Sequence, residues 1–171
     1  ARTDLFNAFE KGALVFNYLG HGGEDGLAVE RIWEKSDGQN LNNPFRYPLF
    51  VTITCEFSRF DNPLRPTAGE YTYWNPKGGA IAMITTIRSI GQFSAENFNP
   101  LLTKNLLSFG SNNYISIAEA LRISKNTNPN SSTNVVVFIG DPALHLAIAK
   151  PKINLTKVND IAISQPIDDF K

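Results

Sequence analysis

The chain has 171 residues, 42% hydrophobic and 11% aromatic, which is enough for one domain with a full core. Sixteen basic residues balance 16 acidic ones, and no lysine- and arginine-rich stripe points to a nucleic-acid partner. The single cysteine excludes an internal disulfide and a cysteine-based zinc site, and no apolar run is long enough to predict a membrane span. The chain opens without methionine and directly on a helical pattern, so we expect a fragment of a longer protein.

Short apolar runs predict the strands of this chain. Continuous runs, rather than alternating ones, are typical of strands buried on both faces. These runs span residues 13–19, 49–54, 80–86 and 135–139, with a further short one at 144–148. Helical patterns lie at residues 2–11, 27–34, 99–108 and 116–125. Strands that alternate with helices predict an α/β fold, in which helices cover both faces of a mainly parallel sheet.

The segments between these elements differ in length and composition. Residues 36–44 and 126–134 are polar and are expected to be surface loops. The long irregular segment 56–76 is expected to be a functional loop or a lid. After residue 150 the pattern changes to alternating apolar residues. We therefore expect one domain over residues 1–150, followed over 151–171 by a linker or the first strand of another domain.

A reactive side chain follows each of the first two predicted strands. His21 comes after the first strand within a glycine-rich segment, and Cys55 ends the second, with 33 residues between them. Open α/β sheets keep their active sites at the carboxyl ends of the strands. A thiol attacks as the thiolate, and an imidazole can take its proton and later protonate a leaving amine. The two residues therefore predict a cysteine nucleophile paired with a general base and acid.

Each half of this pair also has a simpler interpretation. A lone cysteine is more often a small buried hydrophobe, and a histidine beside glycines is often a turn residue. The two together, each at a strand end, favour catalysis, and the amides of Gly22 and Cys55 are candidates for an oxyanion hole. An α/β-hydrolase is a rival, but its nucleophile lies between glycines in a tight turn, and no glycine flanks Cys55 here.

Five charged residues near these segments have two interpretations each. Glu24 and Asp25 could hold a metal with His21, but we expect them to cap a following helix, because acidic residues favour helix starts. Arg59, Arg65 and Arg88 could bind an acidic sugar or a substrate carboxylate, although surface salt bridges are the commoner use of exposed arginines. No metal and no cofactor are expected.

Several stretches resemble the gingipain family of the caspase-like clan of cysteine peptidases. They are NYLGHGGEDGLAVERIW, FVTITCEFSRFDNP, AGEYTYWNPKGGAIAMITTIR and VFIGDPALHLA. Within that family they look most like the surface peptidases of the type IX secretion system. The resemblance covers residues 1–150 and implies a caspase-like three-layer α/β/α fold, of which this chain is the C-terminal part of the catalytic domain.

The resemblance assigns roles to the residues already singled out. It implies that His21 is the general base and acid, that Cys55 is the nucleophile, and that the Gly22 and Cys55 amides are the oxyanion donors. The carboxylate that orients the histidine in this family comes from chain before the histidine. Little chain precedes His21 here, so that third residue is expected to lie before residue 1, and the isolated fragment could be inactive.

The substrate is expected to be an extended peptide beside the end of the third strand, because such peptides often add to exposed edges. The expected substrate-binding residues are Glu56, Arg88, Ser89 and Ile90.

The resemblance further implies a partner set and a place of action. Such enzymes remove the C-terminal sorting domains of secreted proteins and can transfer the new C-terminus to an anionic lipopolysaccharide. They act at the cell surface with an outer-membrane β-barrel partner, and an immunoglobulin-like domain follows their catalytic domain. The alternative is a non-catalytic scaffold that presents the loop Tyr71–Trp74 to a partner.

Overall fold

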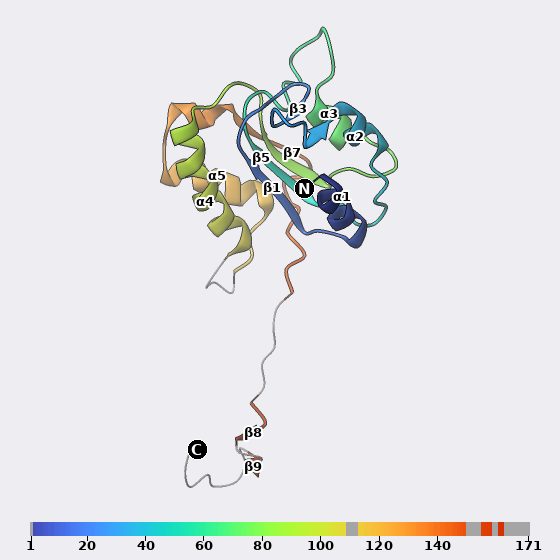
Figure 1. The fold of residues 1–171 in the computed structure, drawn as a ribbon. Helices are drawn as coiled ribbons and strands as arrows, with labels where there is room; N and C mark the ends of the chain where they lie inside the picture. The colour runs from blue at the N-terminus through green and yellow to red at the C-terminus, as the bar shows by residue number, and fades with distance from the viewer. Residues whose placement is uncertain (1, 109–112, 150–154, 159–160, 163–171) are drawn as a thin grey trace.

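The computed structural model describes residues 2–108, 113–149, 155–158 and 161–162 (Figure 1). A four-stranded sheet with the order β1-β5-β6-β7 forms its centre. Its strands are β1 (Val15–Leu19), β5 (Leu49–Ile53), β6 (Ala82–Thr86) and β7 (Val136–Ile139). The first three run parallel, and β7 runs antiparallel to β6. The predicted α/β fold with a mainly parallel sheet is confirmed.

Helices cover both faces of this sheet, which gives three layers. The helices are α1 (Arg2–Lys11), α2 (Lys35–Asn40), α3 (Ala68–Tyr73), α4 (Gln92–Leu107), α5 (Ile117–Thr127) and the short 3-10 helix η1 (Ser131–Val135). Figure 1 shows α4 and α5 on one side of the sheet and α1, α2 and α3 on the other. Among the described residues, no helix has the length and apolar character needed to span a membrane.

Two smaller antiparallel sheets complete the described structure. The strands β2 (Gly22–Gly23), β3 (Gly26–Leu27) and β4 (Trp33–Glu34) form a small sheet directly after β1. The strands β8 (Lys157–Val158) and β9 (Ile161–Ala162) pair as a hairpin. This hairpin falls in the segment 151–171, where a linker or a further domain is expected. Most of that segment lies outside the described residues, and the domain boundary stays a prediction.

The central strand β5 shows why continuous apolar runs predicted the sheet. All five of its residues are buried. Leu49, Val51 and Ile53 pack with α4 and α5, while Phe50 points to the opposite face. Because successive side chains of a strand point to opposite faces, a strand with helices on both sides must be apolar throughout.

An aromatic cluster fills the layer between the sheet and α1. It consists of Phe6, Phe9, Phe16, Trp33 and Phe50, with ring centroids 4.7 to 6.4 Å apart. Trp33 is fully buried and belongs to β4, so the cluster anchors the small sheet that follows His21 against the main body. The packing of α1 therefore supports the position of the glycine-rich segment.

Three segments differ from the sequence prediction because local hydrogen bonding overrides the apolar pattern. Residues 27–34 form strands and turns rather than a helix, since Ala28 and Arg31 have positive φ angles of 61° and 53° that end any helical run. The predicted loop 36–44 contains α2, and the long segment 56–76 contains α3.

Both unpredicted helices begin with a capping box, a motif that can be recognised in the sequence as the start of a helix. At α2, the side chain of Asp37 accepts a hydrogen bond from the Glu34 amide at 2.7 Å. At α3, the side chain of Glu70 accepts one from the Thr67 amide at 2.7 Å, and Thr67 Oγ1 accepts one from the Glu70 amide at 3.3 Å. These bonds satisfy amide groups that would otherwise lack partners at the first turn.

Two further predictions were wrong at the C-terminal side. Helix α4 begins at Gln92 rather than at Asn99, so Pro100 lies inside it. Residues 144–148 form no strand; the Leu144 carbonyl instead accepts a hydrogen bond from the Ile117 amide at 2.8 Å, at the start of α5. This bond and the packing of Leu144 and Leu146 against the core hold the segment, without strand pairing.

Candidate active site

The register of the two parallel strands brings His21 and Cys55 level with each other. Strand β1 pairs with β5 from Val15–Leu49 to Leu19–Ile53, a constant offset of 34 residues. Each candidate residue lies two positions beyond the last pair, and Cys55 follows His21 by that same offset. Both side chains are therefore delivered at the carboxyl edge of the sheet, where the sequence predicted them.

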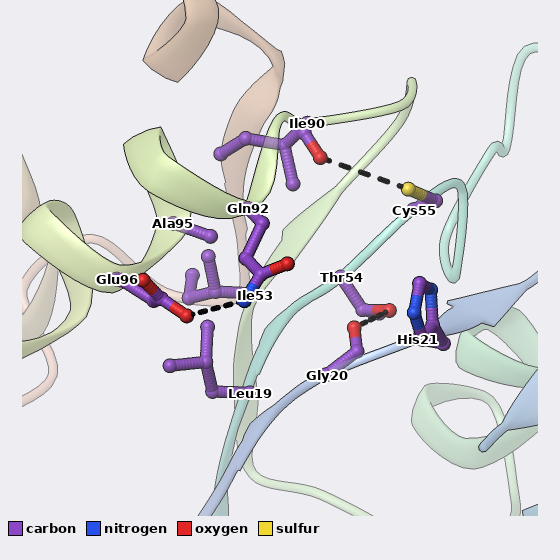
Figure 2. A pocket seen from close by; sticks show the side chains of 10 residues that line it. All are labelled: Leu19, Gly20, His21, Ile53, Thr54, Cys55, Ile90, Gln92, Ala95 and Glu96. Carbon is purple, nitrogen blue, oxygen red and sulfur yellow. Dashed lines mark hydrogen bonds between the residues drawn. The ribbon is translucent and has the colours of Figure 1, made fainter.

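His21 and Cys55 line one cavity of about 320 Å³ (Figure 2). Its walls come from the ends of β1 and β5, the loop after β6 and the first turns of α4. The lining residues are Leu19, Gly20, His21, Ile53, Thr54, Cys55, Ile90, Gln92, Ala95 and Glu96. The imidazole is exposed and the thiol half-buried, so neither group is sealed away from solvent.

The Cys55 thiol has a defined neighbour and a sharply turned backbone. Its S–H donates to the Ile90 carbonyl with a separation of 3.8 Å, and Figure 2 shows the sulfur turned toward that carbonyl. The next residue, Glu56, adopts a left-handed conformation with φ of 51°. A non-glycine residue rarely adopts this conformation, and such strain is often found at active sites. The turn directs the chain away from the cavity immediately after Cys55.

The backbone of His21 is held by two hydrogen bonds. Its carbonyl accepts from the Tyr18 hydroxyl at 2.7 Å and from the Ala28 amide at 2.8 Å. Burial raises the pKa of Tyr18, so its hydroxyl keeps the proton that it donates. Thr54 adds a third tie by donating from Oγ1 to the Gly20 carbonyl at 2.7 Å. The segment around the imidazole is therefore anchored even though the ring itself is exposed.

Gly22, the proposed oxyanion donor, occupies a position that only glycine fits. A Cβ at this residue would lie 2.6 Å from Thr54 Oγ1 and 3.2 Å from the Gly26 carbonyl. The Ala28 amide donates a hydrogen bond to the His21 carbonyl across the hairpin. Hydrogen-bonded and non-hydrogen-bonded pairs alternate along antiparallel strands, so the next pair, Gly22 and Leu27, is non-hydrogen-bonded and its amides face away from the partner strand. The Gly22 amide therefore points away from β3 and keeps its place as a candidate oxyanion donor.

The four predicted substrate-binding residues fall in different surroundings. Ile90 lines the cavity and contacts the thiol. Arg88 forms a two-point ion pair with Asp61, with N–O distances of 2.5 and 2.8 Å. Glu56 pairs with Arg59 at 3.4 Å, and Ser89 is exposed and does not line the cavity. The structure thus brings one of the four directly to the thiol.

The expectation that Glu24 and Asp25 cap a helix is wrong, because β3 rather than a helix begins directly after them. They form the turn between β2 and β3. Glu24 is buried, 8% exposed, and binds Arg65 Nε at 2.7 Å. Asp25 pairs with Lys35 at 2.8 Å. Since cations already neutralise both carboxylates, the metal interpretation of this segment finds no support in the geometry.

The arginines Arg59, Arg65 and Arg88 all pair with carboxylates, as the commoner interpretation predicted. Exposed pairs of this kind contribute little individually. The pairs of Arg59 and Arg65 with buried Glu24 differ, because one partner lies away from solvent.

Several residues at or beside the cavity were not predicted from the sequence. Gln92 and Glu96 come from the first turns of α4 and share a hydrogen bond of 2.7 Å on the cavity wall. Helix α4 was predicted to start later, so these residues had no predicted element to place them. Tyr18 lies in β1 and Thr54 directly follows β5, and each contacts the backbone of the segment that carries His21. Their polar side chains within apolar runs were the available signal.

A cysteine and a histidine at neighbouring strand ends of a three-layer α/β/α domain, facing one open cavity, define the class of cysteine-peptidase-like domains. The model of peptidase family C25 matches residues 1–147. The chain belongs to this family.

Solved structures show the same fold. The chain superposes on the Arg-specific cysteine proteinase gingipain R (RgpB) with a TM-score of 0.72 and 18% identity, covering 85% of this chain and 36% of that one. The complex of Porphyromonas gingivalis RgpB pro- and mature domains matches with a TM-score of 0.68 and 18% identity, over 85% of this chain and 37% of that one. A structure described as a protease matches with a TM-score of 0.70 and 17% identity, over 90% of this chain and 40% of that one. The chain therefore spans between 36 and 40% of these proteins. No curated protein matches it.

The buried Glu24 carboxylate predicts loss of stability in acid. The hydrogen bond from Arg65, supported by Asn62 and by the charge of Arg59, holds the pKa of Glu24 below its ordinary value of 4.5. A carboxyl group whose pKa is lower in the folded than in the unfolded protein stabilises the fold. This contribution is complete when the pH is above the unfolded-state pKa, and it is lost as the pH falls through the folded-state pKa. We expect the melting temperature of the wild type to fall toward that of Glu24→Gln as pH decreases below about 4.5. A constant difference between the two proteins, measured by circular dichroism from neutral pH to pH 3, would contradict this.

Proposed function

We propose that this chain carries the nucleophile and the general base and acid of a cysteine endopeptidase. The observation that carries the proposal is the shared cavity at the carboxyl ends of β1 and β5, which His21 and Cys55 both line. Membership of a peptidase family supports the same reaction class. The thiol's present contact with the Ile90 carbonyl is compatible with this role, because catalytic hydrogen bonds often form only when substrate is bound.

The proposed reaction follows from the chemistry of the pair. His21 takes the proton of Cys55, and the thiolate attacks the carbonyl carbon of a peptide bond. The amides of Gly22 and Cys55 stabilise the resulting oxyanion, each donor contributing about 3 kcal/mol. His21 then protonates the departing amine as the C–N bond breaks, which leaves a thioester. Water or an amine attacks this thioester and releases the acyl group, and the thiol recovers its proton.

The substrate would lie along the loop after β6. The cavity-lining Ile90 provides main-chain groups beside the thiol, and the exposed Ser89 precedes it in the same loop, so an extended peptide could bond to this segment. The cavity floor formed by Leu19, Ile53 and Ala95 is apolar, and Gln92 and Glu96 add polar groups on one wall. The cavity is thus suited to a side chain with an apolar stem.

A finer proposal concerns the biological substrate. The motifs resemble PorU, the surface peptidase of the type IX secretion system in Bacteroidetes. On that basis the protein would remove C-terminal sorting domains from secreted cargo at the cell surface and transfer the new C-terminus to an anionic lipopolysaccharide, with an outer-membrane β-barrel as partner. Mass spectrometry of mature cargo tests this step: a C-terminus joined to a sugar amine supports transfer, whereas a free carboxylate shows hydrolysis alone.

A peptidyl acyloxymethyl ketone separates an enzyme from a scaffold. A reactive thiolate displaces the carboxylate of this probe and forms a thioether at its sulfur. We expect the adduct on the peptide that contains Cys55, and we expect it to form slowly in His21→Ala. Equal, slow labelling of both proteins would leave only the scaffold interpretation.

One observation favours the scaffold alternative as a second candidate. Tyr71–Trp74 forms the end of α3 rather than a loop, and Trp74 is 63% exposed. An apolar cavity of about 360 Å³ adjoins it, lined by Phe60, Glu70, Tyr73, Trp74, Phe138 and Ile139. Exposed aromatic residues around a cavity are typical of binding surfaces. This surface and the Cys55 cavity are separate, so a partner could bind there without excluding catalysis.

A further inference from the structure

Glu24 is a buried carboxylate that gathers donors from a distant part of the chain. Arg65 Nε lies 2.7 Å from Oε2, and Asn62 Nδ2 lies 3.1 Å from both carboxylate oxygens. Arg59 Nη1 lies 3.3 Å from Oε1. The Glu24 carbonyl also accepts a hydrogen bond from the Ala68 amide at 2.8 Å, at the start of α3. Glu24 therefore ties the hairpin turn to three residues of the loop 59–65 and to the start of α3.

The two segments that Glu24 joins are those that carry the candidate catalytic residues. Glu24 lies three residues after His21, in the turn between β2 and β3. Its side-chain partners all lie in residues 59–65, which begin four residues after Cys55. No other buried carboxylate among the described residues binds partners from this loop.

This connection matters because the strand pairing stops before the reactive residues. The ladder between β1 and β5 ends at Leu19 and Ile53, so neither His21 nor Cys55 is held by it. Beyond the ladder, the hydrogen bond from Thr54 to the Gly20 carbonyl ties the two chains together at 2.7 Å. The bonds of Glu24 provide the next cross-connection along both segments.

We propose that Glu24 is a positioning residue, which fixes the spacing of the imidazole and the thiol by clamping the hairpin after His21 to the loop after Cys55. The inference rests on the proposed peptidase function and adds to it a residue outside the cavity. Misplacement of reacting groups by about 1 Å can cost two orders of magnitude in rate, so a clamp at this point would affect chemistry as well as folding.

The charges around the carboxylate fit a clamp better than a ligand site. Arg59 also pairs with Glu56 at 3.4 Å, and Arg65 also pairs with Asp25 at 3.4 Å. Each cation thus bridges two carboxylates. Arg59 joins Glu24 to Glu56, which lies beside Cys55, and Arg65 joins Glu24 to Asp25 on the same hairpin turn. Ionised Glu24 is the group common to both cations, so its neutralisation would loosen both bridges together.

The test measures alkylation of Cys55 by iodoacetamide in the full protein, quantified by mass spectrometry of the peptide that carries this residue. The substitution Glu24→Gln keeps the shape and removes the charge. We expect it to slow alkylation at neutral pH by about tenfold and to change the pH dependence of the rate, at a temperature where circular dichroism shows it folded. Glu119→Gln is the matched control, because it removes an ion pair of 2.6 Å with Arg122 on remote α5 and should leave the rate unchanged.

A purely structural role would lower the melting temperature of Glu24→Gln but leave both the rate and its pH dependence as in the wild type, which would overturn the inference. If Glu24→Gln is unfolded, Asn62→Ala decides, since it removes the two hydrogen bonds to Glu24 and one from the Leu64 amide but no charge. An unchanged alkylation rate in that variant would overturn the inference too. The proposed peptidase function fails separately, if wild-type alkylation does not depend on His21.

Discussion

Replacing Cys55 with alanine is expected to lower peptide-bond cleavage by roughly five to six orders of magnitude, the scale on which loss of a nucleophile acts in other enzymes. The sulfur forms the covalent bond in the proposed reaction, and no other cysteine in the chain could replace it. Cleavage is measured on peptide substrates.

The fold should survive this substitution. Cys55 is half-buried, and its weak contact with the Ile90 carbonyl at 3.8 Å contributes little to stability. Melting temperatures of the wild type and Cys55→Ala should therefore agree within a few degrees. Cleavage by the variant at more than a tenth of the wild-type rate would exclude Cys55 as the nucleophile.

Replacing Trp33 with alanine is expected to destabilise the domain by about 3 to 5 kcal/mol. The indole is fully buried and contacts four phenylalanine rings, and its Nε1 donates to Thr72 Oγ1 at 3.0 Å. The substitution would leave a cavity in the aromatic cluster and a buried hydroxyl without this donor. The free energy of unfolding from urea titration measures the effect.

Trp74 provides the matched control, because it is the same residue type but 63% exposed. Trp74→Ala should change the free energy of unfolding by less than about 1 kcal/mol. Similar losses in the two variants would show that the aromatic cluster does not anchor the hairpin as described.

The strands could be predicted from the sequence because each is a short, mostly apolar run. Burial along the whole strand holds for β5 and β6, whereas the edge strand β1 has no buried residue, contrary to the expectation for residues 13–19. The run 13–19 became β1 at Val15–Leu19, and the run 49–54 became β5 at Leu49–Ile53. The same reasoning placed His21 and Cys55 at the ends of these strands, and the register then brought them level. The residues that follow parallel strands indicate the position of the site, because neighbouring parallel strands end at the same edge of the sheet.

The hairpin after His21 and the partners of Glu24 could not be predicted, because they depend on tertiary contacts that the spacing of residues does not show. The helix expected at 27–34 fails because positive φ angles at Ala28 and Arg31 turn the chain back to form β3 and β4. The partners of Glu24 lie 35 to 41 residues away, and only the folded loop brings them to it. Local patterns predict elements, whereas the cavity and the clamp arise from tertiary packing.

The central claim is that the imidazole of His21 activates the thiol of Cys55, and the alkylation rate of Cys55 at pH 7 in the wild type and in His21→Ala tests it most directly. A base beside the thiol raises the thiolate fraction, so the wild type should react at least about tenfold faster than the variant. Equal rates in two folded proteins would contradict the account.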